Sequence, residues 1–510
     1  LGNSRFIVSD RLNLEQRQVV EFVLGSRDRA VNISGAAGTG KTVTLQELHR
    51  GLQDAGKDIL ALAPTVSAVE ELKMVGFKDA MTIERLLQDP NIQAWHKVLI
   101  IDEAGMVSGR QMLELLQIAE QNSARIVFSG DTQQIQSVEA CDALRILEKE
   151  SRLKSVSLRE VKRQTAADYR EAIQELRRNP GRGLERLQEI GAVRELPFLE
   201  RPQAIARAYL DSAAKGQDAL VVCATHDEIG RVTEAIRSER KKAGDLSKTA
   251  VMSRDVSLNW TTAQKSETRN FRTGQLLRFH RAVRGIARNE TVEVAGIEKE
   301  HLLVRNDRGR IHAIPTNQVK AFDVIERKSI EIASFDRLMI TANCRMPALH
   351  TTNGEIVTVS RIDAKGRVHL KDGRTLPSNF RQFTHGCAVT AHGSQGKSVD
   401  AVIIAADGMK KELFYVAASR GRKEVVVFTG DKQLLKDSIG CSAARQSASE
   451  LARKVTHRPA RGIRRGLTAA RQAVMRAARY FALIRRRESP KSLVERQSIM
   501  EQEYDNGISR

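Results

Sequence analysis

The 510-residue chain has few cysteines and few aromatic side chains. Its five cysteines stand far apart and form no C-x-x-C pair, which argues against structural zinc. Free thiols of this kind suit a reducing cytoplasm, and we expect the protein there. Phe, Trp and Tyr together make up 4% of the residues. Any nucleic-acid contact should therefore be made mostly to phosphates, with few stacking platforms.

Long apolar runs and targeting signals are also missing. No run approaches the ~20 apolar residues of a membrane span, and no signal peptide opens the chain. We therefore expect no membrane insertion. The chain starts at Leu1 without an initiator Met, which is consistent with a fragment or a processed piece of a longer protein.

The charge is strongly one-sided. A formal net charge of +21 and a pI near 10 exceed what solubility requires and favour a polyanion as partner. A hydrophobic content of 41% and a mean hydropathy of −0.36 describe a globular protein. The length predicts three or four domains.

Residues 35–42 read GAAGTGKT and fill every fixed position of the phosphate-loop pattern G-x-x-x-x-G-K-[ST]. The apolar segment 30–33 before them predicts a buried strand, and 43–52 predicts the following helix. Backbone N–H groups of such a loop point at phosphate oxygens, its lysine reaches the β- and γ-phosphates, and its hydroxyl ligates Mg²⁺. A glycine-rich turn is the alternative, but the flanking elements favour nucleoside triphosphate binding. The residues predicted to contact the nucleotide are Gly35, Ala36, Ala37, Gly38, Thr39, Gly40, Lys41 and Thr42.

An acidic pair follows the β-prone run 98–101. Such a continuous run is typical of a strand buried on both faces of a parallel sheet, and its carboxyl end lies where a phosphate loop opens. Asp102 is then placed to hold Mg²⁺ together with Thr42, and Glu103 to polarise the attacking water. A solvated acidic turn is the alternative. The next predicted strand, 125–129, ends near Gln134, a polar side chain that can sense the γ-phosphate.

In this order the segments resemble superfamily 1 helicases, specifically the RecD-like branch, superfamily 1B. Residues 14–17 look like its Q motif, 62–65 like motif Ia, 158–164 like motif IV, 389–396 like motif V and 415–420 like motif VI. The resemblance implies that Gln16 reads adenine and that Arg163 and Arg420 are arginine fingers completing a catalytic set with Lys41, Glu103 and Gln134. It also implies a nucleotide contact from Gly396 and single-strand contacts from Pro64, Thr65, Thr390, His392 and Ser394.

The amino-acid sequences of several segments are similar to the helicase half of conjugative relaxase–helicases of the TraI/TrwC type. These segments are 130–144, 259–264 and 272–279. Those relatives have Gly where Cys141 stands, and we expect little consequence because Cys is small. No H-x-H is present and the five tyrosines are dispersed, so nicking chemistry is not encoded. A nicking domain could precede Leu1, or the chain could be a stand-alone relative.

The fold class we predict is α/β: two RecA-like P-loop domains, a β-rich SH3-like insertion in the second, and a basic helical C-terminal extension. The insertion could clamp a DNA strand or serve only as a packing module. From Cys441 to Arg487 the chain has 12 Arg, one Lys and one acid; its amphipathic pattern could lie on nucleic acid, on anionic membrane or on the protein itself. The predicted boundaries are 1–157 for the first RecA-like domain, 158–252 and 382–440 for the second, 253–381 for the insertion and 441–510 for the extension and tail.

The resemblance implies a monomeric, ATP-dependent and Mg²⁺-dependent DNA helicase that moves 5′→3′ on single strands. Single-stranded DNA and duplex junctions would be its substrates, and conjugative transfer proteins its possible partners. Three alternatives stay open: a stand-alone DNA repair helicase, a nucleotide-gated binding module without unwinding, and an RNA helicase. The presence of Glu103, Gln134, Arg163 and Arg420 together favours an enzyme over a degenerate module.

Overall fold

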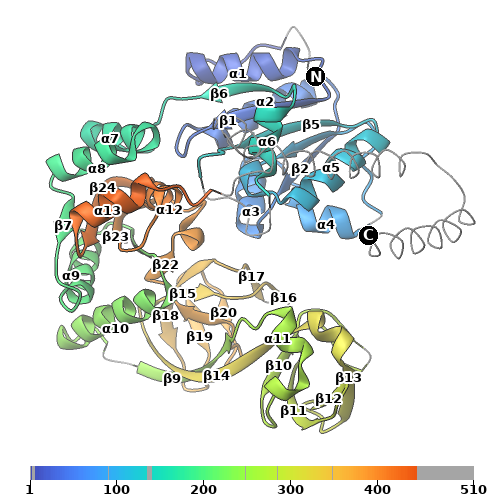
Figure 1. The fold of residues 1–510 in the computed structure, drawn as a ribbon, viewed down its shortest axis with the longest axis vertical. Helices are drawn as coiled ribbons and strands as arrows, with labels where there is room; N and C mark the ends of the chain where they lie inside the picture. Colours follow the sequence, from blue (N-terminus) through green and yellow to red (C-terminus); the bar gives the residue numbers. More distant parts are fainter. Residues whose placement is uncertain are drawn as a thin grey trace, which may run out of the picture. The chain divides into compact units, whose positions relative to one another are not determined.

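The fold is known from a computed structural model, shown in Figure 1. It describes residues 2, 6–89, 91–134, 141–246, 249–283, 285–346 and 349–444. All of these belong to one compact unit, Leu1–Arg445. The greater part of the predicted C-terminal extension, from 445 onward, lies outside the described residues.

The first part of the unit is built on a six-stranded parallel sheet with the order β3-β2-β4-β5-β1-β6. Strand β4 consists of four consecutive buried aliphatic residues, as expected of a strand covered on both faces. The carboxyl ends of β1, β4 and β5 therefore meet at one edge of the sheet. The strands are β1 (Ala30–Gly35), β2 (Ile59–Ala63), β3 (Met81–Thr82), β4 (Val98–Ile101), β5 (Arg125–Gly130) and β6 (Lys154–Leu158).

Helices cover both faces of this sheet and bury two separate cores. One core joins α1, α2 and α3 to one face, and the other joins α4, α5 and α6 to the opposite face. Alternate residues of a strand point to opposite faces, so Ile100 lies in the first core and Ile101 in the second. The helices are α1 (Leu14–Gly25), α2 (Lys41–Asp54), α3 (Val66–Met74), α4 (Ile83–Gln88), the 3₁₀ turn η1 (Ala104–Met106), α5 (Gly109–Gln121) and α6 (Ala143–Glu150).

A second parallel sheet has five strands in the order β22-β8-β23-β24-β7. Its strands come from two stretches of sequence that are separated by the β-rich segment. Helices again pack against both faces over two cores. The elements are α7 (Ala167–Arg178), α8 (Pro180–Glu189), β7 (Val193–Glu195), α9 (Arg201–Ala214), β8 (Ala219–Cys223), α10 (His226–Lys242), β22 (Ala388–Thr390), η4 (His392–Ser394), β23 (Val399–Ala405), α12 (Lys411–Ala418), β24 (Gly421–Thr429) and α13 (Lys432–Gly440).

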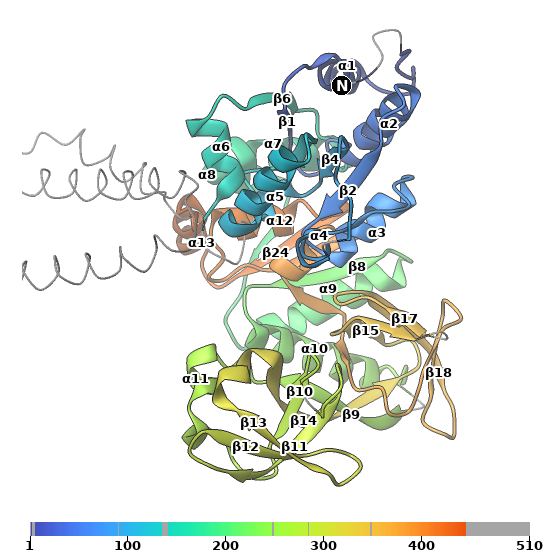
Figure 2. The same ribbon diagram turned by 90° about the vertical axis from the view of Figure 1, so that its right-hand side faces the viewer.

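The segment between β8 and β22 forms antiparallel sheets over two further cores. A six-stranded sheet contains β9 (Thr249–Ser257), β10 (Leu276–Phe279), β11 (Thr291–Ile297), β12 (His301–Arg305), β13 (Ile311–Pro315) and β14 (Phe322–Ala333). A five-stranded sheet contains β15 (Arg337–Ile340), β18 (Ile356–Ile362), β19 (Val368–Leu370), β20 (Thr375–Leu376) and β21 (Phe383–His385). The remaining elements are α11 (Thr262–Ser266), η2 (Thr268–Asn270), η3 (Thr316–Ala321), β16 (Cys344–Met346) and β17 (Leu349–Thr351). Both Figure 1 and Figure 2 show α11 beside β10–β13.

The predicted fold class is confirmed in its two parallel sheets and its β-rich insertion. The SH3-like classification of that insertion stays a prediction. Its sheets extend beyond the expected limits of 253–381, because β9 already starts at Thr249 and β21 ends at His385. Both strands pair with insertion strands, β9 with β14 and β21 with β15. None of the described helices has the length and apolarity that a membrane crossing requires.

A buried ion cluster ties the insertion to α10. Asp336, whose side chain is 4% exposed, accepts hydrogen bonds from Arg237 and Arg240. Arg237 also pairs with Glu331 of β14 at 3.2 Å. Removing one partner of such a group leaves an uncompensated buried charge, so the cluster fixes the insertion firmly to α10.

Candidate nucleotide and nucleic-acid site

The phosphate loop connects β1 to α2 and opens at the amino end of that helix. Gly38 and Gly40 have φ values of +79° and +82°, which side-chain-bearing residues rarely adopt. The Lys41 ammonium donates to the Gly35 carbonyl at 2.8 Å and so stays folded over the loop. Free N–H groups at a helix amino end together with a lysine form a site for phosphate.

Two neighbouring segments lie so close to this loop that a side chain at either of two glycine positions would clash with them. A Cβ on Gly40 would come within 2.4 Å of the Gln16 side-chain nitrogen, and one on Gly38 within 2.5 Å of Arg163 Cβ. Gln16 is buried; its nitrogen donates to the Thr39 carbonyl at 3.4 Å, and its oxygen caps α1 by accepting from the Asn13 N–H. The structure thus places Gln16 against the loop backbone, and contact with a base stays a prediction.

The acidic pair lies at the carboxyl end of β4, as the sequence indicates. Asp102 is buried and accepts a hydrogen bond from the Ser129 hydroxyl at 2.8 Å. Burial and the neighbouring Glu103 raise the pKa of Asp102 to about 6, while Lys41 acts in the opposite direction. Glu103 has a φ of +49°, a strained conformation of the kind that persists at functional sites.

Glu71 on α3 belongs to the same cluster, although the sequence analysis missed it. Its carboxylate lies 3.4 Å from the position that a Cβ on Gly396 would occupy, so α3 and the predicted motif V meet here. Burial raises the pKa of Glu71 to about 7; Glu103 and Asp102 add to the rise, and the two arginines Arg163 and Arg420 oppose it. Glu71 is one of two adjacent acids within a helix, and no sequence pattern sets it apart from Glu70.

The proposed γ-phosphate sensor is held by its own loop. Gln134 is 4% exposed, and its side-chain nitrogen donates to Asp131 Oδ2 at 3.2 Å. Residues 135–140 of the predicted motif lie outside the described residues. Cys141, at the end of this gap, has a φ of +85°. We expected little consequence of Cys141 because Cys is small, and this reason was wrong. The positive φ at this position, rather than the volume of the side chain, favours Gly.

The two predicted arginine fingers meet at the carboxyl end of α12. Arg163 Nη1 donates to the Ser419 carbonyl at 3.0 Å. Arg420 is 2% exposed and its Nε donates to the Val416 carbonyl at 2.9 Å. Burial and then the nearby Arg163 lower the pKa of Arg420 to about 9, because the two cations repel.

The site thus brings together acids and cations from both sheets, some buried (Asp102 and Arg420) and others partly buried (Glu71, Glu103 and Arg163). Thr42 and Asp102 offer hydroxyl and carboxylate oxygens, which are the donors that Mg²⁺ prefers, so the residues present fit this ion. An anionic ligand beside Arg163 and Arg420 would relieve their mutual repulsion. The arrangement suits a metal-bound triphosphate.

The residues predicted to contact a DNA strand differ in how exposed they are to solvent. Thr65 caps α3 by accepting from the Ala68 N–H at 3.2 Å, directly after the partly exposed Pro64. Thr390 is partly exposed and His392 is exposed in the turn after β22. Ser394 is the exception: it is fully buried and its hydroxyl donates to the Ala391 carbonyl at 2.7 Å. That prediction is corrected, because Ser394 closes the turn and presents nothing to a strand.

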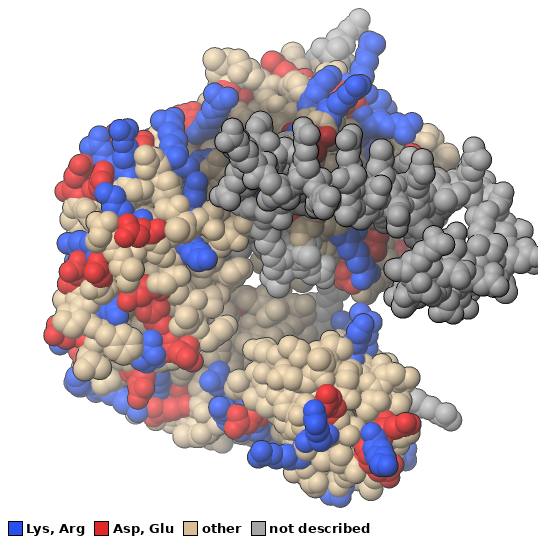
Figure 3. Space-filling model, in the orientation of Figure 1, with Lys and Arg blue, Asp and Glu red and all other residues tan. Residues whose placement is uncertain are grey.

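On the face that Figure 3 shows, surface charge alone does not mark a track for nucleic acid. In Figure 3 the basic and acidic side chains are interspersed over the left-hand part of the face shown. The predicted strand contacts therefore depend on the placement of individual loops near β2 and β22.

Comparison with known proteins finds similar sequences and structures among helicases and conjugation proteins. Residues 11–197 match the AAA domain family. The chain is 24% identical to the multifunctional conjugation protein TraI of Escherichia coli K12, over 87% of the chain and 29% of that protein. It is 31% identical to the ATP-dependent RecD2 DNA helicase of Deinococcus radiodurans, over 30% of the chain and 22% of that protein. The crystal structure of Pif1 helicase from Candida albicans matches with a TM-score of 0.43 at 18% identity, covering 87% of this chain and 99% of the other.

The chain is similar to the superfamily 1B helicases. The predicted resemblance, including its conjugative side, is thereby confirmed. The chain spans about 30% of the length of the conjugation protein it matches.

Proposed function

We propose that the chain is an ATP-driven DNA translocase and helicase that moves 5′→3′ on single strands, and that it forms the helicase portion of a conjugative DNA-transfer protein. One observation carries the proposal: the charges of Lys41, Glu103, Arg163 and Arg420 belong to one electrostatically coupled cluster, although these residues adjoin strands and helices of two parallel sheets. Charge on a transferring phosphoryl group is best stabilised by cations arriving from more than one side.

The roles at the site follow from position. Lys41 binds the β- and γ-phosphates, and the loop N–H groups of residues 35–42 hold the remaining oxygens. Glu103 orients and polarises the attacking water. Arg163 and Arg420 stabilise the charge that develops in the transition state, and Gln134 senses whether the γ-phosphate is present.

Thr42 and Asp102 would hold Mg²⁺, which would neutralise phosphate charge when bound. Asp102 must be ionised to serve as a ligand, and its raised pKa means that part of the population is protonated below about pH 6. Lys41 opposes this rise and so favours the ligating form.

Coupling to movement follows from the origin of the arginines. Arg163 follows β6 of the first sheet and Arg420 precedes β24 of the second, so bound nucleotide holds both sheets together and its loss releases them. Pro64, Thr65, Thr390 and His392 would contact the strand on the two sides. The similarity to the RecD2 DNA helicase supports DNA as the nucleic acid, and the similarity to TraI supports conjugation as the setting.

A nucleotide-gated binding module without unwinding is the alternative. The two functions differ in whether DNA accelerates ATP turnover and whether duplexes open. The test measures ATP hydrolysis with and without single-stranded DNA, then unwinding of duplexes with a 5′ or a 3′ overhang. We expect DNA-stimulated turnover and opening of the 5′-tailed duplex alone.

The matched control is Lys41→Ala, which should abolish turnover but retain single-strand binding without nucleotide. Stimulated turnover without unwinding would reduce the proposal to a translocase. Preferential opening of the 3′-tailed duplex would reverse the proposed polarity, and equal opening of RNA duplexes would overturn DNA as the specific substrate.

A further inference from the structure

An ion pair joins the sensor loop after β5 to helix α7. Arg177 donates from both terminal nitrogens to the two carboxylate oxygens of Asp131, at 3.1 and 3.2 Å. The side chain of Asp131 is 1% exposed and that of Arg177 is 24% exposed. A bidentate pair of this kind fixes orientation as well as distance, and it is hard to replace by a lysine.

The Asp131 carboxylate has a second partner. Its Oδ2 also accepts from the side-chain nitrogen of Gln134, so sensor and ion pair share one oxygen. The backbone of Asp131 in turn supports the turn that follows Glu103: a Cβ on Gly105 would come within 2.9 Å of the Asp131 carbonyl. A shift of Asp131 would therefore reach both Gln134 and the loop of Glu103.

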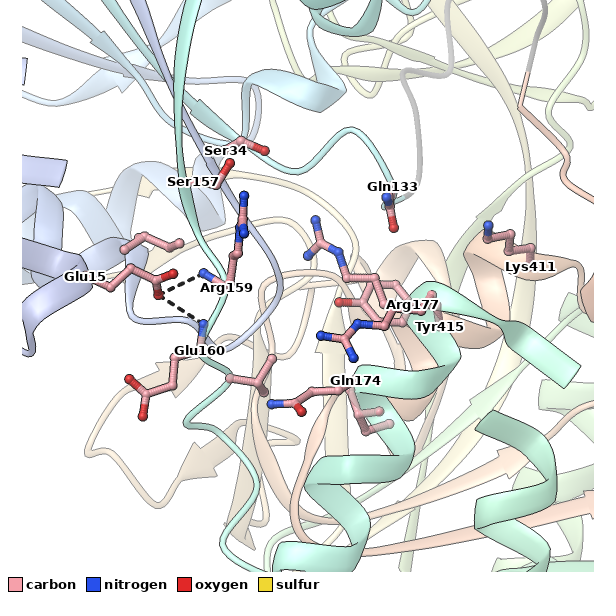
Figure 4. A pocket seen from close by; sticks show the side chains of 14 residues that line it. Glu15, Ser34, Gln133, Ser157, Arg159, Glu160, Gln174, Arg177, Lys411 and Tyr415 are labelled. Carbon is pink, nitrogen blue, oxygen red and sulfur yellow. Dashed lines mark hydrogen bonds between the residues drawn. The ribbon is translucent and has the colours of Figure 1, made fainter. Parts of the chain in front are cut away.

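The other end of the pair belongs to the second sheet. Helix α7 packs against α12, and Figure 4 shows Arg177 beside Tyr415 of that helix. Burial and then Asp131 raise the pKa of Tyr415, and Arg177 acts against this rise, which places all three groups close together. A cavity of about 730 Å³, also shown in Figure 4, is lined by Gln133, Arg177 and Tyr415, among others.

We propose that Arg177 is a positioning residue for ATP hydrolysis. Through its ion pair with Asp131 it orients Gln134 toward the γ-phosphate, and it does so only while the two RecA-like domains are in contact. Arg177 itself touches no phosphate. The inference rests on the proposed function and adds a contact through which the second domain controls the sensor of the first. The neighbouring Arg178 lies exposed on the same helix and offers a matched control.

The test compares Arg177→Gln, Arg177→Lys and Arg178→Gln in steady-state ATP hydrolysis at saturating single-stranded DNA. A misplaced catalytic group can cost on the order of 100-fold in rate. We expect Arg177→Gln to lower kcat by at least about tenfold with KM for ATP nearly unchanged, since the sensor acts in the transition state. Arg177→Lys should restore only part of kcat, and Arg178→Gln should behave as wild type.

The double variant Asp131→Asn with Arg177→Gln distinguishes positioning by Arg177 from a purely structural role of Arg177. Arg177→Gln alone leaves a buried unpaired carboxylate and should lower the melting temperature, whereas the double variant removes both charges and should recover it. If Arg177 positions Gln134, kcat should stay low in the double variant even though stability is recovered. Recovery of kcat together with stability, or normal kcat in Arg177→Gln, would overturn the inference.

Failure of the proposed function would look different. A wild-type protein without DNA-stimulated ATP turnover would remove the enzyme assignment itself. A wild type that turns over ATP, beside an Arg177→Gln variant with the same kcat, would remove only the role of Arg177.

Discussion

The guanidinium of Arg163 is anchored on the carbonyl of Ser419, the residue next to Arg420. Arg163 and Arg420 are more than 250 positions apart along the chain, yet their charges are close enough for Arg163 to depress the pKa of Arg420. Because Arg420 is also buried, the folding of the chain assembles a cationic site at a cost in stability. A site of this kind is explained by an anionic ligand that both arginines meet.

Replacing either arginine should therefore affect catalysis more than binding. For Arg163→Ala and Arg420→Ala we expect kcat for ATP to fall on the order of 10³-fold. Nucleotide affinity should fall less, because the charge that the arginines meet is largest in the transition state. Single-turnover hydrolysis and equilibrium nucleotide binding measure the two effects. The exposed Arg422, paired with Asp400 at 3.2 Å, provides a control as Arg422→Ala. Weakened binding with normal turnover at saturation would show that the arginines only anchor the ground state.

Glu103→Gln should bind Mg-ATP but hydrolyse it far more slowly, because an amide cannot polarise the attacking water as a carboxylate does. Mg-ATP binding should be at least as tight as in the wild type, since a negative charge beside the phosphates is removed. Parallel binding and turnover measurements would check this. If turnover is retained, the catalytic role belongs to another acid, and the neighbouring Glu71 would be the first to examine.

The sequence predicts those parts of the fold that depend on local patterns. The strand expected at 98–101 coincides with β4, and the strand expected at 125–129 falls within β5. Residues with fixed motif spacing, such as Lys41 and Asp102, also lie where the motifs imply.

Features that depend on long-range packing could not be predicted in this way. The pair between Asp131 and Arg177 joins residues 46 positions apart, and neither side chain stands out within its own segment. Ser394 fills a motif position, but its burial depends on how the turn after β22 folds back on itself. Glu71 is one of two adjacent acids on α3, and only the packing of that helix makes Glu71 partly buried while Glu70 is exposed.

Cys141→Gly should stabilise the protein. A residue with a side chain costs about 1–2 kcal/mol in the left-handed region, and glycine avoids this cost. Glycine also gains unfolded-state entropy worth about 0.4–1 kcal/mol, which offsets part of the benefit. The net expectation is an increase in the free energy of unfolding of about 0.5–1 kcal/mol, measured by denaturant titration. Cys141→Ser keeps the strain and should leave stability unchanged. A loss of stability in the glycine variant would show that the loop does not hold φ at +85° in solution.

The raised pKa of Glu71 should make the free energy of unfolding depend on pH. The direction of the pKa shift determines whether stability rises or falls with pH. Its folded-state pKa of about 7 lies above the unfolded value, so the folded state binds more protons between the two values. The free energy of unfolding should then fall as pH rises through this window, and the cost of the buried charge is fully present above about pH 7. A shift of this size corresponds to roughly 3 kcal/mol.

Glu71→Gln removes that charge while keeping the shape of the side chain. The variant should melt at a higher temperature than the wild type at pH 8 and at nearly the same temperature at pH 5, where the wild-type carboxyl is already protonated. Glu70→Gln, at the exposed neighbouring acid that pairs with Lys73 at 2.9 Å, is the control and should show little difference at either pH. An equal change in melting temperature at both pH values would mean that packing rather than charge distinguishes Glu71, and no change at all would mean that its carboxylate reaches solvent.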